Sequence, residues 1–168
     1  MEKTEYKIYD NFLDKEDFQT IKNLMESETF PWYYIADVSH VGQSERDHRN
    51  YFYMIHYFYD GSMPKSNHIH QLKPLLDKLK AKSFIRIKGN LYPNFQENEP
   101  DEPHIDYDFS HKAAIFYLNN NNGPTILEDQ TEIECKENRL LLFDGSKPHD
   151  SKYCTDAPYR LNININFF

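Results

Sequence analysis

Near its end the chain reads Tyr159-Arg160-Leu161-Asn162-Ile163-Asn164-Ile165-Asn166-Phe167, in which polar and apolar side chains alternate strictly from Arg160 onward. Successive side chains of a β-strand point to opposite faces, so Arg160 shares one face with three asparagines and the apolar side chains share the other. The stretch therefore predicts a strand with one packed face and one face rich in amide groups.

Residues 84–92 alternate in the same way. Ile85, Ile87 and Leu91 share one face. The opposite face is polar and carries Arg86, Lys88, Asn90 and Tyr92. Further short strands, separated by turn signals, are expected at 112–118, 125–128, 131–135 and 139–143. Many short strands after a helical N-terminal part predict a mainly β fold with flanking helices (α+β), a double-stranded β-helix of the jelly-roll, cupin-like type.

The first half of the chain predicts supporting elements. Asp14 is a suitable N-cap for a helix over 15–27, where apolar residues recur at helical spacing. Residues 51–59 are apolar or aromatic on both alternating faces, which predicts a strand covered on both sides. Pro74 interrupts an apolar helical stripe, so a break or a fresh first turn is expected there. Two polar stretches predict surface loops, 39–50 and 93–103.

Length and composition limit the possibilities. The 168 residues predict a single domain, with helical and strand support over 1–83 and the β-helix core over 84–168. The net charge of −8 disfavours a phosphate backbone as a partner, so no nucleic-acid substrate is expected. No apolar run is long enough to span a bilayer and no signal peptide is visible, which predicts a soluble, cytoplasmic protein. Cys135 and Cys154 form no Cys-x-x-Cys pair, which suits a reducing compartment, with a disulfide between them the less favoured alternative.

Three side chains within this framework have the character of metal ligands. His104 and Asp106 are two residues apart, so an extended strand would point both to one face. His149 follows the turn-rich segment 144–148, after which the chain is expected to re-enter a sheet. Two neutral imidazoles and one carboxylate on one face of an iron ion leave the opposite positions open for substrates and O2. The set predicts a non-haem Fe(II) site.

Arg160 lies beyond His149 at the start of the last strand. A guanidinium is a planar fork that binds a carboxylate through two parallel hydrogen bonds. Arg160 would therefore suit the far carboxylate of a dicarboxylic acid that is bound to the metal.

This ordered set resembles the 2-oxoglutarate- and Fe(II)-dependent oxygenases, in particular their prolyl-hydroxylase-like branch. The resemblance covers about residues 84 to 168 and depends on the His-x-Asp motif, the distal His and the basic residue beyond it. Supporting matches are Tyr92-Pro93, Ala114-Ile115-Phe116-Tyr117-Leu118-Asn119, Gly123-Pro124-Thr125 and Leu140-Leu141-Leu142-Phe143.

The resemblance implies roles for six side chains. Three of them would hold Fe(II) and carry the catalysis: His104, Asp106 and His149. Three others would bind the cosubstrate 2-oxoglutarate: Arg160, Tyr92 and Asn162. An enzyme of this kind is a dioxygenase that uses O2 to hydroxylate an unactivated C–H bond and releases succinate and CO2. The carboxylate of Asp106 counts against a halogenase, which lacks that ligand.

One departure from the family pattern concerns the cosubstrate. As the motifs align, Phe116 stands where relatives often carry a Tyr whose hydroxyl assists the distal carboxylate. Three side chains are candidates to replace that hydroxyl: Asn164, Asn162 and Tyr92.

Several alternatives remain open from the sequence. Asp108 has the same strand parity as Asp106, but it lies farther from His104 along an extended chain. The substrate could be a prolyl or other protein side chain, as the branch suggests, or equally a free amino acid or small metabolite. A non-catalytic jelly roll could use the same ligands to sense or store a divalent ion, and nucleic-acid demethylation would require a basic groove.

Overall fold

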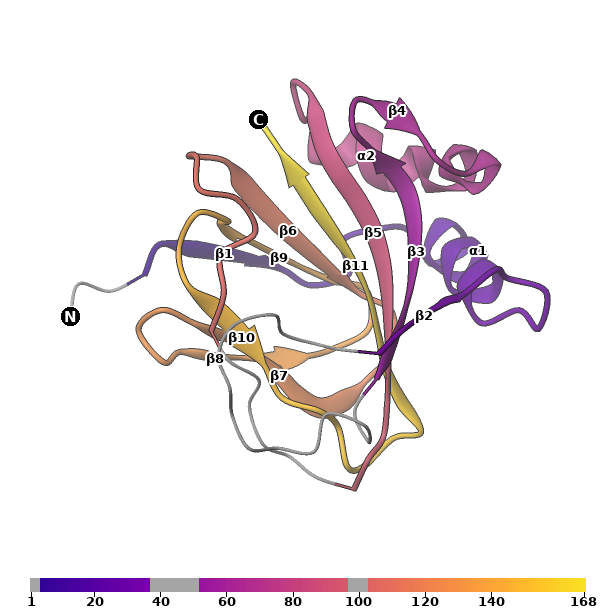
Figure 1. Cartoon of the computed structure of the whole chain (residues 1–168). Coiled ribbons are helices and arrows are strands. Elements are labelled where there is room, and N and C mark those ends of the chain that lie inside the picture. The colour runs from indigo at the N-terminus through magenta and orange to yellow at the C-terminus, as the bar shows by residue number, and fades with distance from the viewer. Residues whose placement is uncertain (1–3, 37–51, 97–102) are drawn as a thin grey trace.

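The computed structural model describes residues 4–36, 52–96 and 103–168, in which a large antiparallel sheet faces a small one (Figure 1). In order across the large sheet, the strands are β1 (Tyr6–Tyr9), β9 (Arg139–Asp144), β6 (Lys112–Tyr117), β11 (Tyr159–Phe167), β5 (Phe84–Pro93), β3 (Tyr53–Asp60) and β2 (Tyr33–Ile35), with β4 (Met63–Pro64) paired to β3. The small sheet has the order β10 (His149–Ser151), β7 (Asn121–Leu127) and β8 (Glu132–Cys135). The predicted mainly β, double-stranded β-helix class is confirmed.

The helices cover the face of the large sheet that is turned away from the small sheet (Figure 1). They are α1 (Lys15–Met25), the short 3-10 helix η2 (Asn67–Leu72) and α2 (Lys73–Leu79). The apolar side chains of β11 pack with those of α1 in one buried core that includes Leu161, Ile163, Phe18 and Ile21. Burying each Leu or Ile contributes about 1.5–3 kcal/mol, so the apolar face of β11 fixes which way this strand is turned.

Several boundaries differ from the predicted ones. The helix expected over 15–27 ends at Met25, and Pro74 opens the first turn of α2, as its missing N–H allows. The strand β3 is not covered on both sides, because Tyr57 in its middle remains 36% exposed. The predicted turn before residue 125 is partly strand, since β7 begins at Asn121. The predicted loop 39–50 lies outside the described residues, as does part of the loop 93–103.

The inner faces of β5 and β11 pair in four cross-strand rows. The paired residues are Arg160 with Tyr92, Asn162 with Asn90, Asn164 with Lys88, and Asn166 with Arg86. We call these eight side chains the polar floor. Their apolar neighbours on the same strands face the helices, as the alternation predicted, so the amide-rich face of β11 is turned toward the space between the two sheets.

None of the described helices is both long and apolar enough to cross a membrane. Cys135 and Cys154 are both buried, free thiols in this structure. Burial raises the pKa of Cys135 to about 11, which keeps this sulfur protonated and unreactive at neutral pH.

Candidate active site

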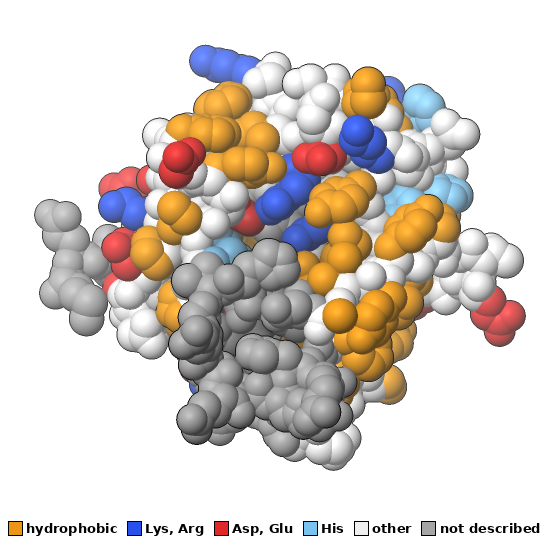
Figure 2. All heavy atoms as spheres, viewed as in Figure 1, with side chains coloured by type: hydrophobic (Ala, Val, Ile, Leu, Met, Phe, Trp, Pro, Cys, Tyr) orange, Lys and Arg blue, Asp and Glu red, His pale blue; other side chains and the backbone are white. Residues whose placement is uncertain are grey.

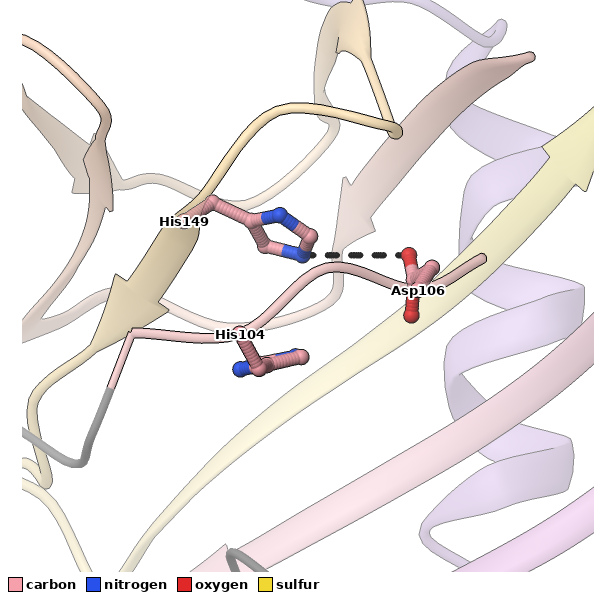
Figure 3. Close-up of side chains that lie close together, drawn as sticks. All are labelled: His104, Asp106 and His149. Carbon is pink, nitrogen blue, oxygen red and sulfur yellow. Dashed lines mark ion pairs between the residues drawn. The ribbon is translucent and has the colours of Figure 1, made fainter. Parts of the chain in front are cut away.

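The three predicted metal ligands meet at one end of the polar floor. Side-chain donor atoms of His104, Asp106 and His149 all lie within 4.8 Å of one another (Figure 3). The Nε2 atom of His149 is 3.7 Å from Oδ2 of Asp106. Asp108, the rival carboxylate, is exposed and does not belong to this group.

Backbone pairing holds the two histidines opposite each other. The N–H of His104 donates to the carbonyl of His149 at 3.0 Å, and the N–H of His149 donates to the carbonyl of His104 at 2.9 Å. Their ring centroids are 4.6 Å apart as a result. Nδ1 of His149 lies 3.0 Å from the carbonyl oxygen of Lys147. A proton on Nδ1 satisfies that carbonyl and leaves the Nε2 lone pair directed at Asp106 and available to a metal.

Asp106 reaches the group by a route that differs from the predicted strand. His104 forms a single β-bridge with His149. Asp106 follows in a bend, and its backbone N–H donates to the carbonyl of Gly145 at 3.3 Å. A side chain at Gly145 would collide with His111, because a Cβ there would lie 2.3 Å from the His111 ring. The side chains of His104 and Asp106 therefore reach the same site although the two residues do not lie on one strand.

The Asp106 carboxylate is held by the far rows of the polar floor. Nη2 of Arg86 donates to Oδ1 at 2.6 Å, and the amide of Asn166 donates to Oδ2 at 2.8 Å. Burial alone would raise the pKa of Asp106, but the charge of Arg86 and the hydrogen bond from Asn166 hold it well below its ordinary range. Asp106 is thus a carboxylate at neutral pH, with Oδ1 occupied by Arg86 and Oδ2 turned toward His149.

Arg160 lies at the opposite end of the polar floor and is buried. Its Nε donates to the carbonyl of Gly123 and its Nη2 to the hydroxyl of Thr125, both at 3.0 Å. Among the described residues, no carboxylate lies within ion-pair distance of this guanidinium. Its partners in the described part of the chain are neutral, so these residues leave its charge uncompensated in a buried position, which is costly without an anion.

The other two predicted cosubstrate residues lie near Arg160: Tyr92 is in the same row, and Asn162 is in the next row toward the metal ligands. Tyr92 and Asn162 line the same cavity as the metal-ligand group and Arg160. The Arg160 guanidinium is centred 5.3 Å from the centroid of the Tyr92 ring. The amide of Asn90 donates to the Asn162 side-chain carbonyl oxygen at 3.0 Å. Oδ1 of Asn90 and Nδ2 of Asn162 are buried and have no hydrogen-bond partner among the described residues. A buried acceptor and donor of this kind call for a polar ligand.

The interpretation of Phe116 requires a correction. Phe116 faces the helices, where its ring packs edge-on against Phe18 at 6.1 Å. The next residue, Tyr117, faces inward; its hydroxyl lies 2.7 Å from that of Thr125, and its ring centroid is 5.9 Å from the Arg160 guanidinium. A Tyr hydroxyl is therefore present beside Arg160, and the motif alignment was displaced by one residue. Neighbouring residues of a strand point to opposite faces of the sheet, so a displacement by one residue exchanged an outward-facing Phe for an inward-facing Tyr.

Sequence reasoning assigned no role to Arg86, Lys88, Asn90 or Asn166. The signal was present in the strict alternation of residues 84–92, which put three of the four on the face of Tyr92. What the alternation does not reveal is which strand pairs with β11 and in which register. Figure 2 shows the outcome on this face of the molecule, where Lys and Arg side chains lie in a hollow next to acidic side chains and a His.

Comparison with known proteins bears on the fold. No protein-family model and no curated protein matches the chain. Several solved structures are similar to it. A prolyl-4-hydroxylase from Pseudomonas putida has 15% identity and a TM-score of 0.65 over 98% of this chain and 92% of its own. A 2OG-Fe(II) oxygenase family oxidoreductase from Burkholderia pseudomallei has 12% identity and a TM-score of 0.70, over 96% and 84%.

A third similar structure is HygX from Streptomyces hygroscopicus, solved with nickel and 2-oxoglutarate bound. It has 9% identity and a TM-score of 0.64, over 98% of this chain and 82% of its own. At such low identities the likeness concerns the fold. The chain has the fold of the prolyl hydroxylases and 2OG-Fe(II) oxygenases, and the predicted resemblance to them is confirmed at that level.

Proposed function

We propose that the protein is an Fe(II)- and 2-oxoglutarate-dependent dioxygenase that hydroxylates an unactivated C–H bond and releases succinate and CO2. Fe(II) would be held by His104, Asp106 and His149. 2-Oxoglutarate would extend from the metal to Arg160. The observation that carries the proposal is the combination of a three-ligand group and a buried, uncompensated guanidinium in one cavity.

The residues present fit both groups chemically. Two imidazoles and one carboxylate form the ligand set of open, non-haem iron sites. Arg86 occupies Oδ1 of Asp106 and so favours a one-oxygen ligand, which preserves open positions on the metal. At the other end, the guanidinium of Arg160 and the unpartnered Nδ2 of Asn162 supply donors for an anionic ligand, with Tyr117 close by.

Each part of the chain then has a definite task. When bound, Fe(II) and 2-oxoglutarate activate O2, one oxygen atom ending in succinate and the other in the hydroxyl group on the substrate. The backbone pairing of His104 and His149 fixes the angle between two ligands. Arg160 and Asn162 orient the dicarboxylate, and Tyr92 covers it with an aromatic face that limits the access of water.

A sensor or storage protein needs the same three ligands but has no use for Arg160. An uncompensated buried guanidinium destabilises a protein that binds only the metal, which favours the oxygenase over the metal sensor. The substrate would be a prolyl or other protein side chain, or a small molecule such as a free amino acid.

Anaerobic spectroscopy tests the proposal. Protein loaded with Fe(II) is expected to develop a visible charge-transfer band when 2-oxoglutarate is added, and His104→Ala should abolish it. The exposed His70, which lies on η2 away from the group, provides the matched control His70→Ala, which should keep the band. A wild-type protein that binds Fe(II) and shows no band would favour the sensor.

A further inference from the structure

The polar floor contains one cation that the proposed chemistry does not use. Lys88 on β5 pairs with Asn164 on β11 and lines the cavity together with His104 and Asp106. Its ammonium lies 5.7 Å from the centroid of the Tyr53 ring, a contact that shields a positive charge without neutralising it. No carboxylate among the described residues lies within ion-pair distance of it.

Lys88 is the cation of the cavity lining that has no counter-ion among the described residues and no assigned ligand. The described lining contains two cations, Lys88 and Arg160, and two carboxylates, Asp106 and Asp150. Asp106 already pairs with Arg86, and Arg160 is assigned to the far carboxylate of 2-oxoglutarate. An ammonium that is largely removed from water without a close counter-ion is retained at a cost that a bound anion removes.

The position of Lys88 places it at the metal end of the cavity. Asn164, in the same row as Lys88, reaches Oδ2 of Asp106 at 3.5 Å, so the row is level with the metal ligands. Along β5, Lys88 is four residues from Tyr92, which pairs with Arg160; four residues of strand span about 13 Å, so Lys88 does not share the far carboxylate with Arg160. The near carboxylate of 2-oxoglutarate would lie on the divalent metal, which leaves the Lys88 ammonium for a further anion.

We propose that Lys88 binds a carboxylate of the substrate, and that the protein hydroxylates a small molecule carrying a free carboxylate, such as an amino acid, rather than a prolyl residue inside a peptide. The inference rests on the proposed oxygenase function and specifies its substrate class. A carboxylate matches the single charge of the Lys88 ammonium, whereas a phosphate at pH 7 carries about −1.5 to −2. An internal prolyl residue offers no anion at all.

Paired probes test the inference. Succinate formation is measured with each free L-amino acid, with the corresponding L-amino acid amide, and with N-acetyl-L-proline amide as the peptide mimic. The wild type should prefer an acid over its amide by about tenfold or more in kcat/KM, which corresponds to 1.4 kcal/mol. Lys88→Met should remove most of this preference, and Lys88→Arg should retain part of it. The exposed Lys15 on α1 provides the control Lys15→Met, in which the preference should persist.

A binding measurement covers the case in which no probe is turned over. Zn(II) has no redox chemistry, so protein loaded with Zn(II) and 2-oxoglutarate remains intact and can be titrated calorimetrically with acetate. Acetate should bind about tenfold more weakly to Lys88→Met than to the wild type. Equal preference or equal acetate binding in the two proteins would overturn the role of Lys88, as would a wild-type preference for the peptide mimic. If the Fe(II) protein shows no 2-oxoglutarate band, the oxygenase proposal fails first and the inference fails with it.

Discussion

The two ends of the polar floor present the same chemical group in opposite electrostatic situations. Arg86, at one end, donates to Asp106 over 2.6 Å. Arg160, at the other, donates only to neutral oxygens among the described residues. The first guanidinium has its anion inside the chain and orients a metal ligand, whereas the second has no anionic partner among the described residues and suits an anion from outside. A buried cation therefore indicates a binding site only when its counter-ion is missing.

The largest effect is expected from breaking the Arg160 end. Arg160→Met removes a charge-assisted, two-bond contact worth about 2–4 kcal/mol, so the affinity for 2-oxoglutarate should fall roughly 30- to 1,000-fold. Titration of the 2-oxoglutarate band measures it. Arg139 pairs with Asp10 near the surface, and Arg139→Met is the matched control that should leave the affinity unchanged. An unaltered affinity in Arg160→Met would show that the dicarboxylate binds elsewhere.

Replacing Arg86 should change the stability of the protein more than its affinity for 2-oxoglutarate. Arg86→Met leaves the buried Asp106 carboxylate without its counter-ion, which should lower the free energy of unfolding of the metal-free protein by about 3 kcal/mol. Zn(II) supplies a replacement cation, so saturating metal should stabilise this variant more than the wild type. Urea unfolding with and without Zn(II) gives both values.

The control for this stability change removes an outer ion pair. Lys22 lies 2.9 Å from Glu137 near the surface, and Lys22→Met should cost at most about 1 kcal/mol. If Arg86→Met and Lys22→Met lower the free energy of unfolding by equal amounts, the Arg86–Asp106 pair is no more important for stability than an ordinary surface pair.

A smaller effect on stability is expected at Lys88, and it should depend on pH. Burial, with Arg86 adding repulsion, lowers the pKa of Lys88 to about 8 from 10.5, so the folded state disfavours the charged ammonium. This penalty is fully present below pH 8 and disappears as the pH rises toward 10.5, because the unfolded chain then also loses the proton. Lys88→Met should therefore stabilise the metal-free protein by about 1–2 kcal/mol at pH 7 and by nothing near pH 10.5. Destabilisation at pH 7 would assign Lys88 a structural role instead.

The alternating stretches show what the sequence determines and what it leaves open. The period of residues 160–167 was sufficient to separate the two faces of β11, and the resemblance, which implies that Arg160 points inward, predicted which of them faces the space between the sheets. The joint position of His104, Asp106 and His149 followed from their order and from the resemblance, not from periodicity. The Arg86 pair could not be predicted, since it depends on the partner strand and its register.

Phe116 and Tyr117 mark the limit most clearly. Both are large, aromatic and fully buried, so neither burial nor composition distinguishes the inner face of β6 from the outer one. Only their neighbours do: Phe116 packs against α1, and Tyr117 reaches Thr125 and the Arg160 guanidinium. A motif alignment without the pairing of β6 to β11 has no means of choosing between them.

The central claim is that Arg160 binds the far carboxylate of an acid whose other end lies on the metal held by His104, Asp106 and His149. The most direct measurement compares 2-oxoglutarate with 2-oxopentanoate, which has the same metal-binding end but no far carboxylate, by titrating the band of anaerobic Fe(II) protein. 2-Oxopentanoate is expected to bind at least about tenfold more weakly than 2-oxoglutarate to the wild type, and Arg160→Met is expected to remove this difference. Equal affinities for the two acids in the wild type would contradict the claim.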